Sequence, residues 1–224
     1  MVKLAREVTL CRLCPRLVAW REEVAETKRA AFRDETYWGK PVAGFGDPAA
    51  RLLIVGLAPA AHGANRTGRP FTGDRSGEWL YDALHRAGFA NQAESISRDD
   101  GLRLSDAYVT ACARCAPPKN RPSPEEMEHC RPYLEREIDL LARLRVILCL
   151  GQIAFTQVMR LLGSRGATLP RPRPRFRHGA EVILPRPFPV LLASYHPSQQ
   201  NTFTGRLTRP MLRSVFSLAR KHLP

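Results

Sequence analysis

The sequence predicts a three-layer α/β/α fold with a four-stranded, mainly parallel central sheet. Short apolar runs alternate with amphipathic segments along the chain, which is the pattern of strands connected by helices. The runs are nearly continuous in apolar residues, as expected for strands that are covered on both faces. Polar loops rich in Gly or Pro follow them, and such loops at the carboxyl ends of parallel strands carry the chemistry of α/β proteins.

Four apolar runs are the predicted strands of the sheet. They are RLLIVGL (51–57), DAYVTAC (106–112), RVILCLG (145–151) and PVLLASYHPS (189–198). The segment AEVILP, shortly before the last run, is expected to add a short edge strand. The run LPRPRPRFRHG (169–179) has no packing pattern, so we expect an exposed loop there.

The predicted helices fill the segments around these strands. Their ranges are 2–29, 75–89, a segment that begins at Ser123, 152–163 and 206–223. Pro15 is expected to interrupt the first of them. Ser123 and Glu126 form a capping box at the start of the third, in which Pro132 could cause a kink. Gly163 is expected to stop the fourth.

The length and composition indicate one globular domain covering residues 1–224. Charged residues make up 25% of the chain and hydrophobic residues 44%, which is not a disordered composition. No apolar run approaches the roughly 18 residues of a membrane span, and MVKLAREVTLCRLC at the start has no signal-peptide core. We therefore expect a soluble, cytoplasmic protein without a membrane partner, and a monomer by default.

The charge balance is strongly basic. Lys and Arg number 35 against 21 acidic residues, a net charge of +14, and 30 of the 35 are Arg. An Arg-rich codon bias would explain this without any function. The alternative is a phosphate-binding surface, because the guanidinium group pairs with phosphate oxygens in a bidentate manner. The size of the excess favours a nucleic-acid partner.

The six cysteines indicate a metal or cluster site rather than disulfides. Cys11 and Cys14 form a Cys-x-x-Cys pair in the first predicted helix, Cys115 follows a strand, and Cys130 lies on the next helix. Four thiolates from three elements can close one site. Zinc usually takes two tight pairs, whereas a [4Fe–4S] cluster accepts scattered ligands more readily. The other two, Cys112 and Cys149, lie in apolar strands and are expected to be core residues.

Three segments, GLAPAAHGANRTGRPFTGD, CAPPKNRPSPEE…C and SYHPSQQN, together resemble the bacterial and archaeal iron–sulfur uracil-DNA glycosylases. They occur in the family order with similar spacing, and the resemblance runs from Cys11 to about Leu207. The type-B group, also called family 5, is the most similar. The type-A group has an acidic residue where this chain has Leu57, and an Asn that grips uracil where this chain has Ala111.

The resemblance implies a DNA glycosylase with a uracil-DNA glycosylase-like fold and a structural [4Fe–4S] cluster on Cys11, Cys14, Cys115 and Cys130. Breaking the C–N bond to the base develops positive charge on the sugar and negative charge on the base. With no acid in the first motif, Asp74 is the carboxylate that would stabilise the sugar cation and orient a water. The alternative is that Asp74 only caps the following helix.

Three further side chains take roles by resemblance. His196 would donate a hydrogen bond to the base carbonyl, Asn120 would help to position the base or the water, and Phe71 would stack on the flipped base. Each also has an ordinary structural alternative. His196 could be a structural hydrogen-bonding residue, Asn120 a turn residue and Phe71 a core residue.

The surrounding loops are expected to contact DNA. The backbone of Gly56, Leu57 and Ala58 would approach the base or a phosphate. The segment QQNTFTGRL resembles the loop that these enzymes insert into the duplex, with Gln200, Asn201 and Phe203 as candidate wedges. In the same loops, Arg66, Arg69 and Arg206 are expected to contact phosphates.

The predicted function is therefore removal of uracil and other deaminated bases, including hypoxanthine, from double-stranded DNA. Ala111 predicts this breadth, because it leaves space where an amide would reject purines. Whether single-stranded DNA is also cut stays open. The alternatives are a strict uracil glycosylase, a DNA-binding module with a four-cysteine metal site and no catalysis, and, less favoured, an electron-transfer role. By its substrate the protein would be nucleoid-associated within the cytoplasm.

Overall fold

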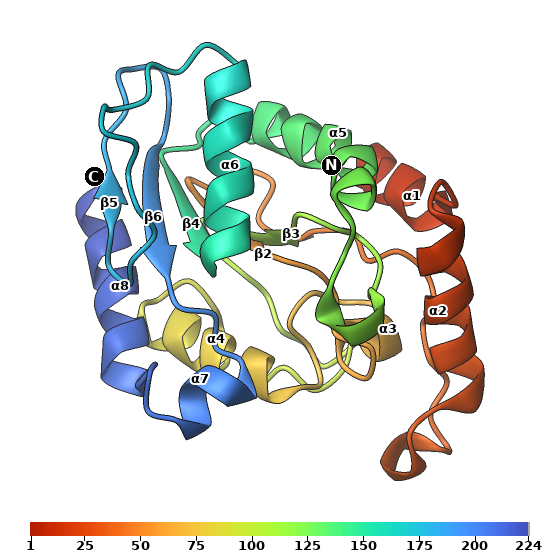
Figure 1. Ribbon diagram of the computed structural model, residues 1–224. Helices are drawn as coiled ribbons and strands as arrows, with labels where there is room; N and C mark the ends of the chain where they lie inside the picture. The colour runs from red at the N-terminus through yellow and green to blue at the C-terminus, as the bar shows by residue number, and fades with distance from the viewer. Residues whose placement is uncertain (224) are drawn as a thin grey trace.

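A computed structural model describes residues 1–223 as a six-stranded sheet covered by helices on both faces (Figure 1). The strand order is β1-β3-β2-β4-β6-β5. The strands are β1 (Phe45–Gly46), β2 (Leu52–Gly56), β3 (Ala107–Ala111), β4 (Val146–Leu150), β5 (Glu181–Val182) and β6 (Val190–Ser194). The inner four are parallel and coincide with the four predicted strands, which confirms the α/β prediction.

The two outer strands correct the predicted strand count. β1 pairs antiparallel with β3, and β5 pairs antiparallel with β6. The short edge strand expected near 180–185 is confirmed as β5. β1 escaped prediction because it is only two residues long and its partner, not its own pattern, makes it a strand.

The helices are α1 (Val2–Leu10), α2 (Pro15–Thr27), α3 (Ala64–Thr67), α4 (Arg75–Arg86), α5 (Pro124–Leu140), α6 (Gln152–Ser164), α7 (Gln199–Phe203) and α8 (Arg209–Lys221). Short 3₁₀ turns cover Ala30–Phe32 and Pro118–Asn120. The predicted helix over 2–29 is two helices, since Pro15 occupies the first turn of α2. Gly163 does not stop α6, which continues to Ser164 before a left-handed Gly166.

Alternate residues of the strands face two separate apolar layers. On one face Leu53, Ile147 and Leu191 pack with residues of α5 and α6. On the other face Ile54 and Leu148 pack with α4 and α8. Both faces of the sheet are thus buried, which confirms the three-layer prediction and explains the continuous apolar runs.

Candidate active site

A narrow cavity lies at the carboxyl ends of β2 and β3, where the sequence predicted the chemistry. We call it the catalytic cavity. Its lining residues are Val42, Ala58, Pro59, Ala60, Ala64, Pro70, Phe71, Asp74, Ser76, Ala111 and His196. Five of these were singled out from the sequence: Ala58, Phe71, Asp74, Ala111 and His196. They come from three loops far apart in the chain, and the parallel sheet brings them together.

The two strands remain paired past their ends, which fixes the first loop of the cavity. Gly56 and Ala111 are partners in the β2–β3 ladder. Beyond them the backbone N–H groups of Cys112 and Ala113 donate to the carbonyl oxygens of Gly56 and Leu57, at 3.0 and 2.8 Å. The side chain of Leu57 lines a neighbouring cavity rather than this one.

Asp74 is both a helix cap and a lining residue of the catalytic cavity. It is the N-cap of α4, and its Oδ1 accepts a hydrogen bond from the Gly77 N–H at 3.0 Å. Burial raises the pKa of the Asp74 carboxyl above its ordinary value of 3.8, while backbone N–H groups of the first helical turn oppose that rise. The expected alternative, a capping role, is therefore present, and it leaves the carboxyl at the cavity wall.

A glycine makes room for this carboxyl. A Cβ atom on Gly63 would lie 2.1 Å from Asp74 Oδ2, so no side chain fits there without moving the carboxyl. No functional role for Gly63 is predicted from the sequence. The signal that could have found it is its position in the Gly-rich first loop, where only contact with another segment explains a missing side chain.

His196 faces Asp74 across the same cavity, directly after β6. Burial lowers its pKa to about 4, so its imidazole is neutral near pH 7. The Asn201 side chain in α7 donates from Nδ2 to the backbone oxygen of His196 at 2.8 Å. Asn201 therefore fixes the backbone that carries His196, and its side chain lines the neighbouring cavity.

Phe71 closes one side of the catalytic cavity. Its ring centroid lies 5.7 Å from that of His196, with the planes tilted by 32°. A Cβ atom on Gly56 would lie 2.7 Å from Phe71 Cζ, so the ring packs directly on the end of β2. The backbone of Phe71 has a φ of 52°, a left-handed conformation that is uncommon for a bulky residue and often found at functional sites.

Other predicted residues lie outside the cavity. Asn120 is exposed at the end of the 3₁₀ turn Pro118–Asn120 and is not among the residues that line the cavity. Gln200 and Phe203 lie on α7, where Phe203 is exposed and stacks with the guanidinium group of Arg75. Arg206 lies over the ring of Tyr195, beside His196.

Two of the three predicted phosphate contacts are buried ion pairs, so the expectation for them was wrong. Arg66 is paired with Glu35 and donates to the Gly73 carbonyl oxygen at 2.8 Å. Arg69 makes a bidentate pair with Asp100, at 2.8 and 2.6 Å. Both guanidinium groups hold the first loop in place and are not available to DNA.

The four predicted ligand thiols meet in one small cavity, which we call the cysteine cavity. Cys11, Cys14, Cys115 and Cys130 line it, from the α1–α2 junction, the loop after β3 and helix α5. Cys112 and Cys149 are buried in the core, as expected. Among residues 1–223, no group of three or more His, Cys, Asp or Glu side chains is arranged to hold a single metal ion.

Two buried arginines lie beside the thiols of the cysteine cavity. Arg21 is almost fully buried, and its Nη1 donates to Cys115 Sγ at 3.1 Å. Arg114 lines the cavity and is paired with Glu137 behind it. The Nε atoms of both have no hydrogen-bond partner among the described residues. Unsatisfied buried donors beside four thiols fit an anionic group, such as a thiolate-ligated iron–sulfur cluster.

No helix among the described residues is long and apolar enough to cross a membrane. Residues 43–219 match the family model described as the uracil DNA glycosylase superfamily. The chain is 56% identical to a type-5 uracil-DNA glycosylase of Thermus thermophilus, over 96% of this chain and 94% of that protein. It is 44% identical to a type-5 enzyme of Pyrobaculum aerophilum, over 93% and 87%, and 33% identical to a type-4 enzyme of the same organism, over 80% of each.

Proposed function

The chain belongs to the uracil DNA glycosylase superfamily, and from this premise we propose that it hydrolyses the N-glycosidic bond of uracil and of other deaminated bases in DNA. The observation that carries the proposal is the catalytic cavity, in which a carboxyl, Asp74, and a neutral imidazole, His196, line the same small space. Those are the two polar groups that base release needs. The product is a free base and an abasic site.

Asp74 acts on the sugar in the proposed reaction. The nucleotide must first leave the DNA stack so that its glycosidic bond reaches the cavity. As the C–N bond lengthens, positive charge grows on the deoxyribose, and the Asp74 carboxylate stabilises it in a site with little water. The same oxygen atoms orient the water that adds to the sugar carbon. The capping hydrogen bond from Gly77 holds the carboxyl in place for both tasks.

His196 acts on the departing base. Because its pKa is lowered to about 4, the ring is a neutral donor at physiological pH rather than a cation. An N–H of the ring donates to the base carbonyl, where negative charge develops as the bond breaks. The hydrogen bond from Asn201 to the His196 backbone keeps this donor oriented.

The remaining cavity residues set the shape of the base site. Phe71 stacks on the flipped base, and the backbone of Gly56 and Ala58 approaches its edge. Ala111 leaves open the position from which an amide side chain would restrict the site to uracil. We therefore include hypoxanthine among the substrates. Asn120, which is exposed in this structure, is assigned to positioning of the base or the water by family resemblance alone.

The cysteine cavity supports a structural [4Fe–4S] cluster on Cys11, Cys14, Cys115 and Cys130. A cluster has an iron at each of four corners, so each of the four thiols that line the cavity would bind one iron. When bound, the cluster joins the α1–α2 segment to the rest of the domain. Purified protein should contain about four irons per chain. Stoichiometric zinc without iron or sulfide would refute this assignment.

Release of free base decides the function. The substrate is a double-stranded oligonucleotide with one uracil, and the products are separated after alkaline cleavage of abasic sites and by chromatography of the free base. Wild type should release uracil in a single turnover, and Asp74→Asn should release it at least roughly 10²-fold more slowly. A protein that binds the oligonucleotide and releases nothing would be a DNA-binding module. A second oligonucleotide with hypoxanthine separates a broad enzyme from a strict one.

A further inference from the structure

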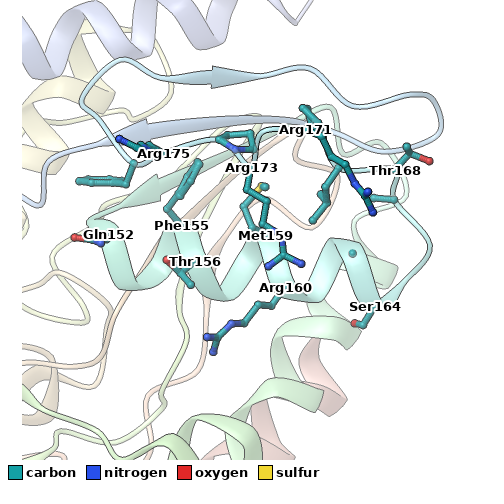
Figure 2. Close-up of a pocket in the computed structure, with 16 residues that line it drawn as sticks. Gln152, Phe155, Thr156, Met159, Arg160, Ser164, Thr168, Arg171, Arg173 and Arg175 are labelled. Carbon is teal, nitrogen blue, oxygen red and sulfur yellow. The ribbon is translucent and has the colours of Figure 1, made fainter.

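A second concave surface, which we call the arginine groove, runs along α6 away from the catalytic cavity. It has a volume of about 930 Å³ and is formed by one side of α6 and the loop that follows it. Figure 2 shows the loop returning antiparallel to α6, with Thr168 near the end of the helix and Arg175 near its start at Gln152. This segment contains most of the Pro/Arg run (169–179), which the sequence predicts to be an exposed loop.

Four arginines line this groove, and their guanidinium groups have no hydrogen-bond or ion-pair partner among residues 1–223. They are Arg160 on α6 and Arg171, Arg173 and Arg175 on the loop. All four are exposed. No residue that lines the groove is acidic. Some other arginines are paired, such as Arg16 with Glu126 and Arg136 with Glu7, whereas the groove brings four unneutralised ones together.

The loop presents these charges on a stiff backbone. Proline alternates with arginine through Pro170, Pro172 and Pro174, and each proline restricts its own φ and lacks an N–H. The segment therefore cannot extend the neighbouring edge of the sheet as a regular strand, and it loses less entropy on binding than a flexible arm would. Three guanidinium groups that line one groove from such a segment form a preorganised anionic-ligand site.

The floor of the groove is apolar and aromatic. Phe176 of the loop is the partly exposed ring of this floor, and Phe155 and Met159 of α6 are buried beneath it. The Phe176 ring lies 5.9 Å from that of Phe155 and 6.0 Å from that of Tyr195. An accessible aromatic ring such as Phe176 beside a row of cations is a combination with which proteins bind unpaired nucleic-acid strands, because a base stacks on the ring while phosphates pair with arginine.

A third cavity, which we call the intermediate cavity, shares lining residues with the arginine groove and with the catalytic cavity. Gln152 and Phe176 line the arginine groove and also the intermediate cavity that contains Tyr195 and Arg206. His196 lines that intermediate cavity and the catalytic cavity. The groove is therefore separated from His196 by one cavity, which contains Arg206, and the DNA strand beside a flipped nucleotide would lead in that direction.

We infer that the arginine groove binds a single-stranded segment of DNA that leads away from the flipped nucleotide. The inference rests on the proposed glycosylase function and adds to it a binding site for flanking phosphates. It also assigns a substrate form, since the partly exposed Phe176 ring can stack on a base only where that base is unpaired.

The test compares two variants with the same change in charge. The groove variant carries Arg171→Gln, Arg173→Gln and Arg175→Gln. The control variant carries Arg33→Gln, Arg103→Gln and Arg143→Gln, three exposed arginines outside the groove. Affinity for a uracil-free single-stranded oligonucleotide is measured by fluorescence anisotropy across a salt series. The groove variant should bind at least roughly tenfold more weakly at low salt, and its log–log salt slope should be smaller by about 2.

The outcomes separate this inference from the proposed function. Duplex uracil release by the groove variant should stay close to that of wild type, which shows a folded, active enzyme. Replacement of the same three residues by Lys should restore most of the salt slope but less of the affinity, because Lys keeps the charge without the planar fork. Equal affinity and slope in the groove and control variants would overturn the inference, as would a loss confined to duplex DNA.

Discussion

The catalytic cavity and the arginine groove, which are separated by the intermediate cavity, treat charge in opposite ways. In the cavity burial favours the neutral forms of Asp74 and His196, and the rest of the lining is mostly apolar. In the groove four arginines are exposed, and within the described part of the chain they form no ion pair. A charge that is kept from water acts strongly over a short distance, whereas an exposed row of charges attracts a polyanion over a longer one. Chemistry and affinity are therefore separable in this molecule.

The largest expected effect comes from removing the cavity's carboxylate. Asn caps helices as well as Asp does, so Asp74→Asn keeps the α4 cap and removes only the negative charge. Single-turnover uracil release should fall by roughly 10²-fold or more, with DNA affinity changed only a few-fold. Asp74→Ala, which also removes the cap, should lose a comparable rate and some stability as well. Activity that survives in Asp74→Asn would leave Asp74 as a cap only.

The next largest expected effect is a difference in salt dependence between DNA binding by the groove and catalysis in the cavity. If four arginines contact phosphates, single-strand affinity should fall by roughly 50-fold between about 50 and 200 mM salt. The single-turnover rate on fully bound DNA should change by less than about twofold over that range, because buried charges are screened little. Anisotropy titrations and rapid quench at saturating protein measure the two. A rate that falls in parallel with affinity would show that the regions are not independent.

The pH dependence sharpens the comparison further. Asp74 must be ionised to act and its pKa is raised, so the rate should fall as pH decreases through a midpoint above the ordinary 3.8. Below that midpoint the rate should drop about tenfold per pH unit. His196 stays neutral down to about pH 4 and adds no change above it. A rate that rises on acidification would mean that His196 acts as a cation.

The smallest expected effect is a change of substrate ratio. Ala111→Asn places an amide in the catalytic cavity. A purine base leaves that amide without a hydrogen-bond partner. An unpaired buried amide costs about 1–3 kcal/mol, so hypoxanthine release should fall roughly fivefold or more relative to uracil release. Matched oligonucleotides with either base give the ratio. The groove does not contact the flipped base in the catalytic cavity, so the affinity for single-stranded DNA should not change.

The four parallel strands could be predicted because each is a continuous apolar run, and the three layers follow from their burial on both faces. β1 could not, since only pairing with β3 makes its two residues a strand. The grouping of Asp74, Phe71, Ala111 and His196 was expected from the family resemblance, and the strand ends that meet at one edge agree with it.

The arginines show where prediction from sequence stops. Arg66 and Arg69 lie in the predicted active-site loop, yet Glu35 and Asp100, distant in sequence, bury and neutralise them. Whether an arginine is free depends on such tertiary partners, which no local pattern reveals. The Pro/Arg run has the opposite outcome. It lacks a packing pattern, and its side chains line a groove because α6 lies beside it.

The cysteine cavity joins thiols from the first helical segment, the loop after β3 and the middle of α5. Any group that bonds to all four closes a chain loop of roughly 100 residues, and a cross-link of that span reduces the free energy of the folded state relative to the unfolded chain by about 4–5 kcal/mol on loop-closure grounds. The last ligand, Cys130, is also the last to be synthesised. If the proposed cluster forms, it can therefore join the amino-terminal helices to the domain only after more than half of the chain has been synthesised.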